Sequence, residues 1–450
     1  MTGLALRSLR FRATAFTATF LSILLGTALI GSFATLVETS RGAMSDVDRD
    51  TLIIMGAVVG GWGTMIVLFS LASTLGIAVR QRGVEIALLR TVGGTPRQAR
   101  RMVRVETLVV AVLASALGAI VAWFGGRALF AAIREGGLVD GSVEFSAGPV
   151  SLGLTALGVV LTSLVSATIA GRRATSGPAT LALADSRSGS GRMPWWRVTF
   201  ALLLIGYGVV MAIVTVAVMA DSDDPYAAMQ TSGSSSILVG LGLATMAPVL
   251  LRWFATALRP LVSRFGAAGQ LAAFNTSRRS HLLAGVLAPV IVFTAAATGT
   301  LMLVGIDGRT LAASTPDSDT ITLLNNVVVG MISLFAANMV VNAFAAVIAH
   351  RRAELARLRL LGATREQVRS SVLAEAGLVA AVGVMLGLVA AMATIVPFAI
   401  ARDEGPVPDG QLWLPIVLAG AAAAITLASA GAAVRRATSV PPLAVTGVAQ

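Results

Sequence analysis

Few residues in this 450-residue chain could perform covalent or metal chemistry. Cysteine is absent, which excludes thiol catalysis, disulfides and thiolate metal sites. The only histidines are His281 and His350, and single histidines at a membrane surface are a simpler interpretation than a two-histidine metal site. None of the 34 basic residues is a lysine. Because the phosphate-binding loop of a P-loop ATPase needs a lysine, this chain should not be a standard P-loop ATPase. Since it also lacks a Ser-His or metal constellation, we expect it to be no enzyme and to hold no cofactor.

The charged residues form a conspicuous segment at Arg80–Glu106, which reads RQRGVEIALLRTVGGTPRQARRMVRVE. A short helix is predicted to end at Gly93, because glycine adopts the left-handed C′ conformation without a Cβ clash. Thr95 is the predicted N-cap of the next helix, with Pro96 at its first position and Gln98 completing a capping box. This second helix should continue directly into the apolar run that follows.

The same segment recurs as RRAELARLRLLGATREQVRSSVLAE at Arg351–Glu375. The copies are offset by 269 residues, and Thr364 and Gln367 form a second predicted capping box. The matched positions are Arg82, Glu85, Leu89, Arg90, Gly93, Thr95, Gln98, Arg100 and Glu106, and then Arg351, Glu354, Leu358, Arg359, Gly362, Thr364, Gln367, Arg369 and Glu375. The pattern therefore indicates an internal duplication, each copy presenting an amphipathic helix at a membrane surface.

Composition predicts a polytopic membrane protein. Hydrophobic residues make up 56% of the chain and charged residues only 12%, with a mean hydropathy of +0.84. The net charge of +12 could suit nucleic acid. However, the arginines are spread over the loops between apolar runs, so contact with membrane lipids and the positive-inside rule explain the charge better. We expect no nucleic-acid partner.

Ten apolar runs reach the length of about 20 residues that spans a bilayer. They lie near 14–36, 52–79, 106–126, 149–170, 198–220, 235–256, 282–304, 322–348, 374–400 and 412–432. The first has basic flanks like a signal peptide, but no clear cleavage site follows, so we interpret it as a retained helix. With both termini cytoplasmic, the outer loops hold 16 of the 22 acidic residues, and 28 of the 34 arginines lie inside. All outer loops are too short for a large extracellular domain.

A second repeated word marks the end of each repeat, RRATSGP at 172–178 and RRATSVP at 435–441. The predicted fold is therefore all-α, with ten transmembrane helices in two pseudo-symmetric four-helix units joined by two extra helices. The predicted divisions are 1–185 for the first unit, 186–197 for a cytoplasmic linker, 198–265 for two connecting spans and 266–450 for the second unit. The short helices are predicted at 81–92 and 350–361.

These residues resemble the FtsX-like permease family of ABC transporters. Its motif, R-x-x-E-I/L-A-x-L-R-x-x-G-A/G-T-x-x-Q, is matched by both copies, and the closing RRA-x-x-x-P also matches. The resemblance implies a permease in the cell membrane that works with two copies of a separate ATP-binding subunit, which holds ATP and Mg²⁺. Hydrolysis of ATP by that subunit would drive the export or extraction of an amphipathic lipid, peptide or drug. The chain departs from the family because it lacks a sizeable extracellular domain, which leaves the outer halves of the spans for substrate contact.

The resemblance assigns the short helices as coupling helices that dock on the ATP-binding subunit. The residues assigned to coupling are Arg82, Glu85, Leu88, Leu89, Arg90, Gly93, Thr95, Gln98, Arg351, Glu354, Leu358, Arg359, Gly362, Thr364 and Gln367. Leu88 and Leu89 would enter an apolar groove, whereas Arg357 replaces Leu88 in the second copy. The alternative is that basic amphipathic helices between spans serve only as interfacial anchors.

Several residues inside the predicted spans have two interpretations. Asn338 and Asn342 share a helix face and either line a substrate path or form helix–helix hydrogen bonds. Gly56 and Gly60 form a GxxxG motif that predicts close helix packing, with span eight as one candidate partner. Glu106 and Glu375, at the inner ends of their spans, either gate the path or pair with a nearby arginine.

Three other functional classes compete with the transporter hypothesis. A signalling permease would transmit ATPase motion without moving cargo, but little outer structure is present to receive the signal. A secondary transporter would need carboxylates or broken helices within the membrane, and the acidic candidates lie at the membrane edges. A membrane enzyme would need a catalytic constellation that two separate histidines do not supply.

Overall fold

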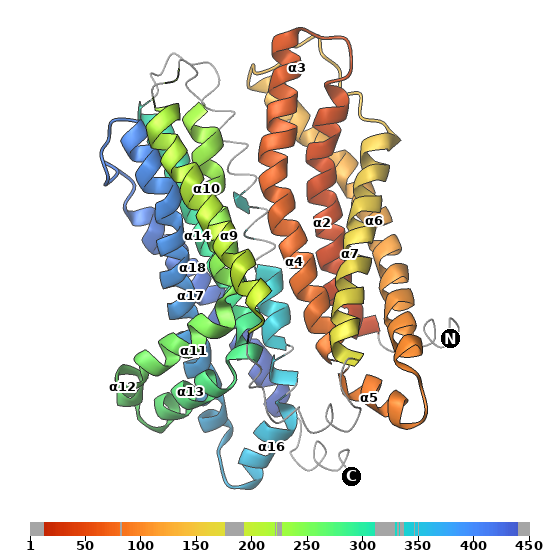
Figure 1. The fold of residues 1–450 in the computed structure, drawn as a ribbon, viewed down its shortest axis with the longest axis vertical. Helices are drawn as coiled ribbons and strands as arrows, with labels where there is room; N and C mark the ends of the chain where they lie inside the picture. Colours follow the sequence, from red (N-terminus) through yellow and green to blue (C-terminus); the bar gives the residue numbers. More distant parts are fainter. Residues whose placement is uncertain are drawn as a thin grey trace. The chain divides into compact units, whose positions relative to one another are not determined.

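The computed structural model describes residues 13–439, with gaps at 82, 176–192, 221, 223–226, 311–328, 331–332, 334–336, 346 and 350. Within these residues the chain forms helices and no strands, so the all-α prediction is confirmed (Figure 1). The chain divides into two compact units, Met1–Arg187 with Asp307–Phe335 and Ser188–Ile306 with Ala336–Gln450. The predicted domain boundaries remain predictions.

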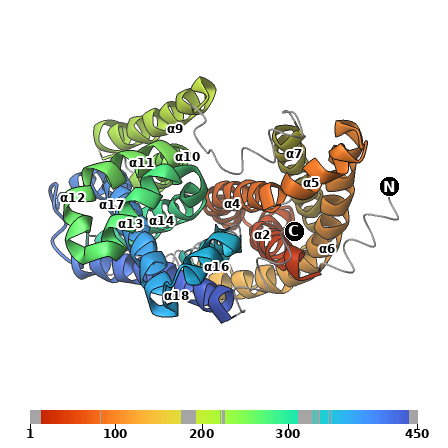
Figure 2. The same ribbon diagram turned by 90° about the horizontal axis from the view of Figure 1, so that it is seen from below.

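Helix α2 is the central helix of the first unit. The described elements of this unit are α2 (Ala13–Thr39), α3 (Asp46–Ile53), the π-helix η1 (Ile54–Val59), α4 (Gly60–Gln81), α5 (Gly83–Thr91), α6 (Pro96–Glu135) and α7 (Pro149–Thr175). Helix α2 contacts α4, α6 and α7, as the view along the bundle shows (Figure 2). Its buried positions include Ile23, Phe33 and Leu36, which therefore form the core of this unit.

The second unit contains both a transmembrane bundle and a set of short helices at one of its ends. The elements are α9 (Trp195–Val214), the π-helix η3 (Thr215–Met219), α10 (Ala227–Thr245), α11 (Ala247–Ala257), α12 (Arg259–Val262), η4 (Ser263–Phe265), α13 (Gly266–Arg278), α14 (Ser280–Thr310), α16 (Arg352–Leu360), α17 (Arg365–Ala401) and α18 (Trp413–Ser439). Helix α14 is the most buried of its long helices. The two predicted connecting spans correspond to α9 and α10, which pack within this unit.

Among the described residues, seven helices are long and apolar enough to cross a membrane, and a bent pair could supply an eighth span. The predicted count of ten therefore remains a prediction. The bent pair differs from the run predicted at 235–256, because α10 and α11 meet at an angle of 75°. Pro248 lies in the first turn of α11. Since proline lacks an N–H and its ring clashes with the preceding turn, it explains the break.

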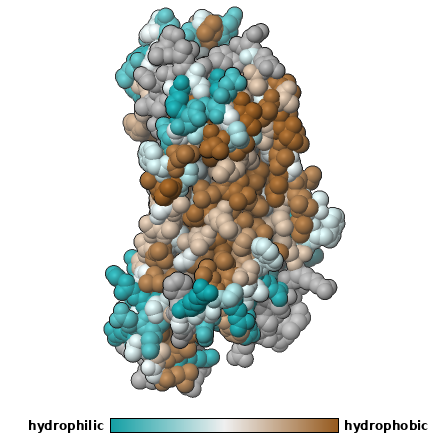
Figure 3. All heavy atoms as spheres, turned by 90° about the vertical axis from the view of Figure 1, so that its left-hand side faces the viewer, coloured by the Kyte–Doolittle hydropathy of each residue, from teal (hydrophilic) through white to brown (hydrophobic). Residues whose placement is uncertain are grey.

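Figure 3 shows an apolar band between two hydrophilic ends on one face of the molecule. Large apolar side chains are also exposed on the long helices of both units, for example Leu154 of α7 at 64% and Ile416 of α18 at 73%. A soluble protein rarely exposes an apolar surface of this extent. The chain is therefore a multi-pass membrane protein.

Glycines on the long helices permit close packing at equivalent places in the two repeats. A Cβ added at Gly118 of α6 would lie 2.8 Å from Cβ of Thr27, and one added at Gly387 of α17 would lie 2.5 Å from Cβ of Thr294. Gly118 and Gly387 are separated by the repeat offset of 269 residues. Both units therefore use the same contact between the central helix and the long helix that follows the capping box.

The predicted close packing at Gly56 and Gly60 also occurs, and its partner is α2. An added Cβ would lie 2.5 Å from Val37 Cγ2 at Gly56 and 2.6 Å from Phe33 Cβ at Gly60. The GxxxG motif therefore holds the η1–α4 segment against the central helix of its own unit.

Replacing Gly387 by alanine should destabilise the second unit, because the new methyl group overlaps Thr294 and the Ile291 carbonyl oxygen. Overpacking of this kind costs about 1–3 kcal/mol. Gly377→Ala is a matched control in the same helix, since a Cβ there meets no atom within 4 Å, and alanine favours helix by up to about 1 kcal/mol. Thermal unfolding in detergent should show a lower Tm for Gly387→Ala only. Equal Tm values would contradict the packing.

Candidate coupling site

The short helices predicted at 81–92 and 350–361 are present as α5 and α16, and both end in the same turn. Gly93 has φ +103° and Gly362 has φ +99°, the left-handed conformation predicted for a helix-ending glycine. Gly94 N donates to Leu89 O at 2.8 Å, and Ala363 N donates to Leu358 O at 3.0 Å. These bonds from C″ to C3 define a Schellman motif in each copy.

Both predicted capping boxes are also present. Gln98 N donates to Thr95 Oγ1 at 3.2 Å, and Thr95 N donates to Gln98 Oε1 at 2.9 Å. Thr364 and Gln367 repeat both bonds at the same distances. The reciprocal bonds satisfy N–H groups that the helix start would otherwise leave without partners. Each short helix is thus joined to the next helix by a short turn with a defined geometry.

The helices that follow are unusually long. Helix α6 contains 40 residues and α17 contains 37. At 1.5 Å per residue they measure roughly 60 and 55 Å, nearly twice the thickness of a bilayer core. The prediction that the helix continues through the arginines into the apolar run is confirmed. Each of these helices is therefore one continuous element from its capping box to the end of its apolar run.

One face of each short helix is buried within its own unit. Ile86 and Ala87 of α5 are each 1% exposed and pack in a core cluster with Val79, Ala99 and Val103. In α16 the equivalent Leu355 and Ala356 are 4% and 5% exposed. Burial of this face fixes which side chains of the helix remain available to a partner.

The opposite side exposes an apolar tip on each helix, which we call the first and second apolar tips. The first consists of Leu88 at 52%, Leu89 at 43% and Val92 at 89% exposure. The second consists of Leu358 at 37% and Leu361 at 85%. Leu88, Leu89 and Leu358 were assigned to coupling from the sequence.

Val92 and Leu361 are the most exposed apolar residues of these turns, and the sequence assignment missed them. Each stands directly before the glycine that ends its helix, at the offset of 269 residues. The repetition of an apolar residue at this position is the sequence signal that could have identified both residues.

The polar coupling residues behave differently in the two copies. Glu85 and Arg90 of α5 are partly exposed, whereas Arg82 lies outside the described residues. In α16, Arg359 Nη1 donates to the Thr438 carbonyl oxygen at 3.0 Å. Thr438 belongs to the repeated RRATS sequence, so this sequence contacts α16. The sequence shows that RRATS is repeated, and the structure adds that in the second unit it bonds to Arg359.

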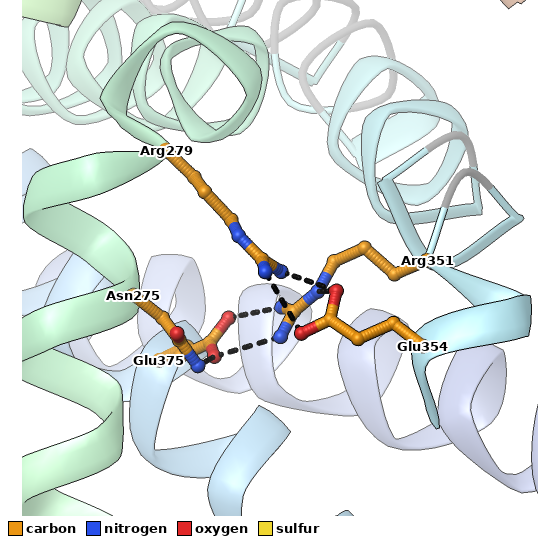
Figure 4. Close-up of polar contacts among 5 residues, drawn as sticks. All are labelled: Asn275, Arg279, Arg351, Glu354 and Glu375. Carbon is orange, nitrogen blue, oxygen red and sulfur yellow. Dashed lines mark hydrogen bonds and ion pairs between the residues drawn. The ribbon is translucent and has the colours of Figure 1, made fainter. Parts of the chain in front are cut away.

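Five polar residues of the second unit form a connected cluster, which we call the ionic cluster (Figure 4). Its members are Asn275 of α13, Arg279 at the turn after α13, Arg351 at the N-cap of α16, Glu354 of α16 and Glu375 of α17. Because they come from three neighbouring helices, their hydrogen bonds connect α16 to both α13 and α17.

The centre of the cluster is the buried pair between Arg351 and Glu375, with side chains 4% and 2% exposed. Arg351 donates through Nη1 to Glu375 Oε2 and through Nη2 to Glu375 Oε1, the latter at 3.1 Å. Asn275 Nδ2 also donates to Glu375 Oε1, at 2.7 Å. Of the two alternatives for Glu375, pairing with a nearby arginine is the one observed. Glu106, its counterpart in the first unit, is likewise buried, at 1% exposure.

The outer part of the cluster is a second ion pair. Arg279 donates to Glu354 through Nη2 at 2.8 Å, and Arg279 Nη1 lies 2.7 Å from Glu354 Oε2. Arg351 Nε lies 3.6 Å from the same oxygen. Partial burial alone would raise the pKa of Glu354, but the hydrogen bond from Arg279 and the charges of Arg351 and Arg279 lower it overall. The pairing therefore stabilises the fold at neutral pH, and that contribution declines as pH falls through this lowered pKa.

Two residues assigned to coupling from the sequence also make contacts inside their own unit. Arg351 is buried, and Glu354, with its side chain 38% exposed, pairs with two arginines. These contacts fix the position of α16. The assignment of both residues to coupling remains a prediction.

The described asparagines of predicted span eight are paired along one helix. Asn342 Nδ2 donates to Asn338 Oδ1 at 3.0 Å, as their spacing predicts. Asn325 and Asn326, in the same predicted span, lie outside the described residues. Neither interpretation of this polar face is tested by the bond, because it joins residues of a single helix.

Glu375→Gln should destabilise the second unit, since it leaves the Arg351 charge buried without its counter-ion. Removing one member of a buried pair costs about 3–5 kcal/mol. Glu366→Gln, at the exposed start of the same helix, should change stability by no more than about 0.5 kcal/mol. The double variant Arg351→Leu/Glu375→Leu should lose less stability than the sum of the losses in Arg351→Leu and Glu375→Leu, which a double-mutant cycle of Tm or denaturant midpoints measures. Additive effects would show that the two groups are not coupled.

Comparison with known proteins agrees with this geometry. A model of the FtsX-like permease C-terminal domain matches the chain twice, over residues 57–179 and 326–442. Each match contains one short helix, one capping box and one RRATS word. A search of curated protein sequences gave no significant match. Because the two matched regions together cover just over half of the residues, the chain belongs to the FtsX-like permease family, as a protein with two such units.

Proposed function

We propose that this permease is the transmembrane subunit of an ABC transporter that exports or extracts an amphipathic molecule. Membership of the family supports a permease that works with an ATP-binding partner. The observation that carries the proposal further is the duplicated coupling element, a short helix with an exposed apolar tip joined through a Schellman turn and a capping box to a membrane-length helix.

Two ATP-binding subunits per chain follow from this proposal, because each coupling helix offers one docking point. The two points are not equivalent. The first tip contains Leu88, whereas the second has Arg357 at the matching position. A leucine that becomes buried contributes apolar area, whereas an arginine must find a partner for its charge. We therefore expect the first copy to supply more of the binding energy.

Movement of the docked ATP-binding subunits would be transmitted to the membrane helices through two different sets of contacts. In the second unit, the ionic cluster ties α16 to α13 and α17, so these three elements would move together. In both units the capping box transmits movement into a long helix. ATP binding and hydrolysis in the partner would thus tilt α6 and α17, with ATP and Mg²⁺ held by the partner alone. Both termini would be cytoplasmic.

The double variant Val92→Asp/Leu361→Asp should strongly weaken binding to the ATP-binding subunit while preserving the fold. These side chains are 89% and 85% exposed, so the substitutions should change stability by less than about 0.5 kcal/mol. Burying unpaired carboxylates in an interface should cost at least about 2 kcal/mol, or roughly thirtyfold in Kd. Co-purification from cells that express both proteins measures this effect.

Val47→Asp is the matched control for that experiment. Val47 is 75% exposed but belongs to α3, at the end of the first unit opposite α5 (Figure 1). It should leave co-purification and Tm unchanged. Normal binding and ATPase stimulation by Val92→Asp/Leu361→Asp would show that α5 and α16 are interfacial anchors and not docking sites.

A further inference from the structure

A cavity of about 320 Å³ lies within the first unit, between α2, the η1–α4 segment and α7. Its walls include Phe33 and Val37 of α2, Gly56, Gly60 and Gly61 of the η1–α4 segment, and Leu154 of α7. The volume is at the lower end of the range of about 300–1,000 Å³ that is typical of small-molecule sites. The cavity therefore suits one apolar chain of a ligand.

The cavity is produced by the same glycines that hold the η1–α4 segment against α2. Gly56 and Gly60 bring the backbones together, while Gly61 points into open space, where an added Cβ would meet no atom within 4 Å. Gly56 also lies in the π-helical turn of η1, a distortion that is frequently found at functional sites. A larger side chain at Gly61 would enter this space without displacing its neighbours.

The mouth of the cavity carries two opposite charges. Glu38 Oε2 accepts a hydrogen bond from Ser151 N at 2.9 Å, and the backbone of Gly148 also hydrogen-bonds the Glu38 carboxylate. These bonds tie the end of α2 to the start of α7 and hold the carboxylate in the lining of the cavity, where an oxygen can accept a further hydrogen bond. Arg41 lies near enough to interact electrostatically with Glu38. Its exposed guanidinium has no hydrogen bond or salt bridge with another side chain in the described part of the chain. An acidic group and a basic group thus stand side by side above an apolar wall.

The cavity opens beside an apolar surface. Val150 and Leu154 at its edge are 53% and 64% exposed, and the same face of α7 continues with Leu157 and Leu161, at 54% and 53%. A helix with such a face in a membrane protein contacts lipid. A lipid could therefore enter sideways, with its chain in the cavity and its head at the charged mouth.

We propose that this cavity binds a phospholipid whose head carries both a phosphate and a primary ammonium. The phosphate would accept hydrogen bonds from Arg41, the ammonium would donate to Glu38, and one acyl chain would lie against Phe33 and Leu154. That the bound lipid is cargo rests on the proposed function, and in the proposed topology the cavity faces the outer leaflet. The binding itself requires only the first unit as the structure shows it.

The test is equilibrium binding of pyrene-tailed phosphatidylethanolamine to the purified full-length chain in detergent, without an ATP-binding subunit. Pyrene-tailed phosphatidylglycerol, which lacks the ammonium, is the comparison lipid. Gly61→Leu should reduce affinity for both lipids at least about tenfold, because the leucine occupies the cavity. Gly158→Leu is the matched control, since Gly158 is an exposed glycine of α7 outside the cavity with no atom within 4 Å of its Cβ position. Arg41→Gln should weaken phosphatidylethanolamine binding about tenfold, with partial recovery in Arg41→Lys.

Two results would overturn the proposal: unchanged binding by Gly61→Leu, or binding of phosphatidylglycerol as tight as that of phosphatidylethanolamine. Measured Tm values identify any variant that has lost its fold, and Gly158→Leu should match the wild-type chain in both measurements. The outcome is separable from the proposed function. A chain that binds the lipid but no ATP-binding subunit would retain the site and contradict the transporter, and the converse result would contradict the site alone.

Discussion

The buried Arg351–Glu375 pair constrains the end of the second unit that carries α16. Separating these groups leaves a charge in a desolvated place, which costs several kcal/mol, so the three helices that supply the ionic cluster are held in one arrangement. The exposed side of α16 depends on this constraint. Arg351 and Glu354 make contacts inside the unit, and the apolar tip, with Leu361 85% exposed, faces away from it.

Outside the cluster, the two units repeat a small set of contacts. Each places a central helix against a glycine of the long helix, begins that helix with a capping box, and leaves an apolar tip beyond a buried face. The short helices and the long helices are therefore positioned by packing, helix caps and hydrogen bonds. The glycines of the η1–α4 segment follow the same logic, since the close approach that they allow also leaves the cavity beside them.

Local signals in the sequence predicted the local structure well. Thr95, Gln98, Thr364 and Gln367 form the predicted boxes because a capping box involves only residues within one turn. The ionic cluster was not predicted as a whole, because Arg279 and Glu354 lie 75 residues apart and their contact depends on how α13 and α16 pack. The π-helical turn and the cavity were missed for the same reason. Val92 and Leu361 were missed because exposure at a helix end follows from the tertiary packing of the opposite face.

Site-specific cross-linking tests the central claim, that α5 and α16 dock on ATP-binding subunits, most directly. The chain has no cysteine, so a single cysteine at Val92 or Leu361 provides a reactive group without background. The account predicts that each of these cysteines forms a cross-link to an ATP-binding subunit in membranes that contain both proteins, and that a cysteine at Val47 forms none. Cross-links from neither Val92 nor Leu361, in a complex that still assembles, would contradict it.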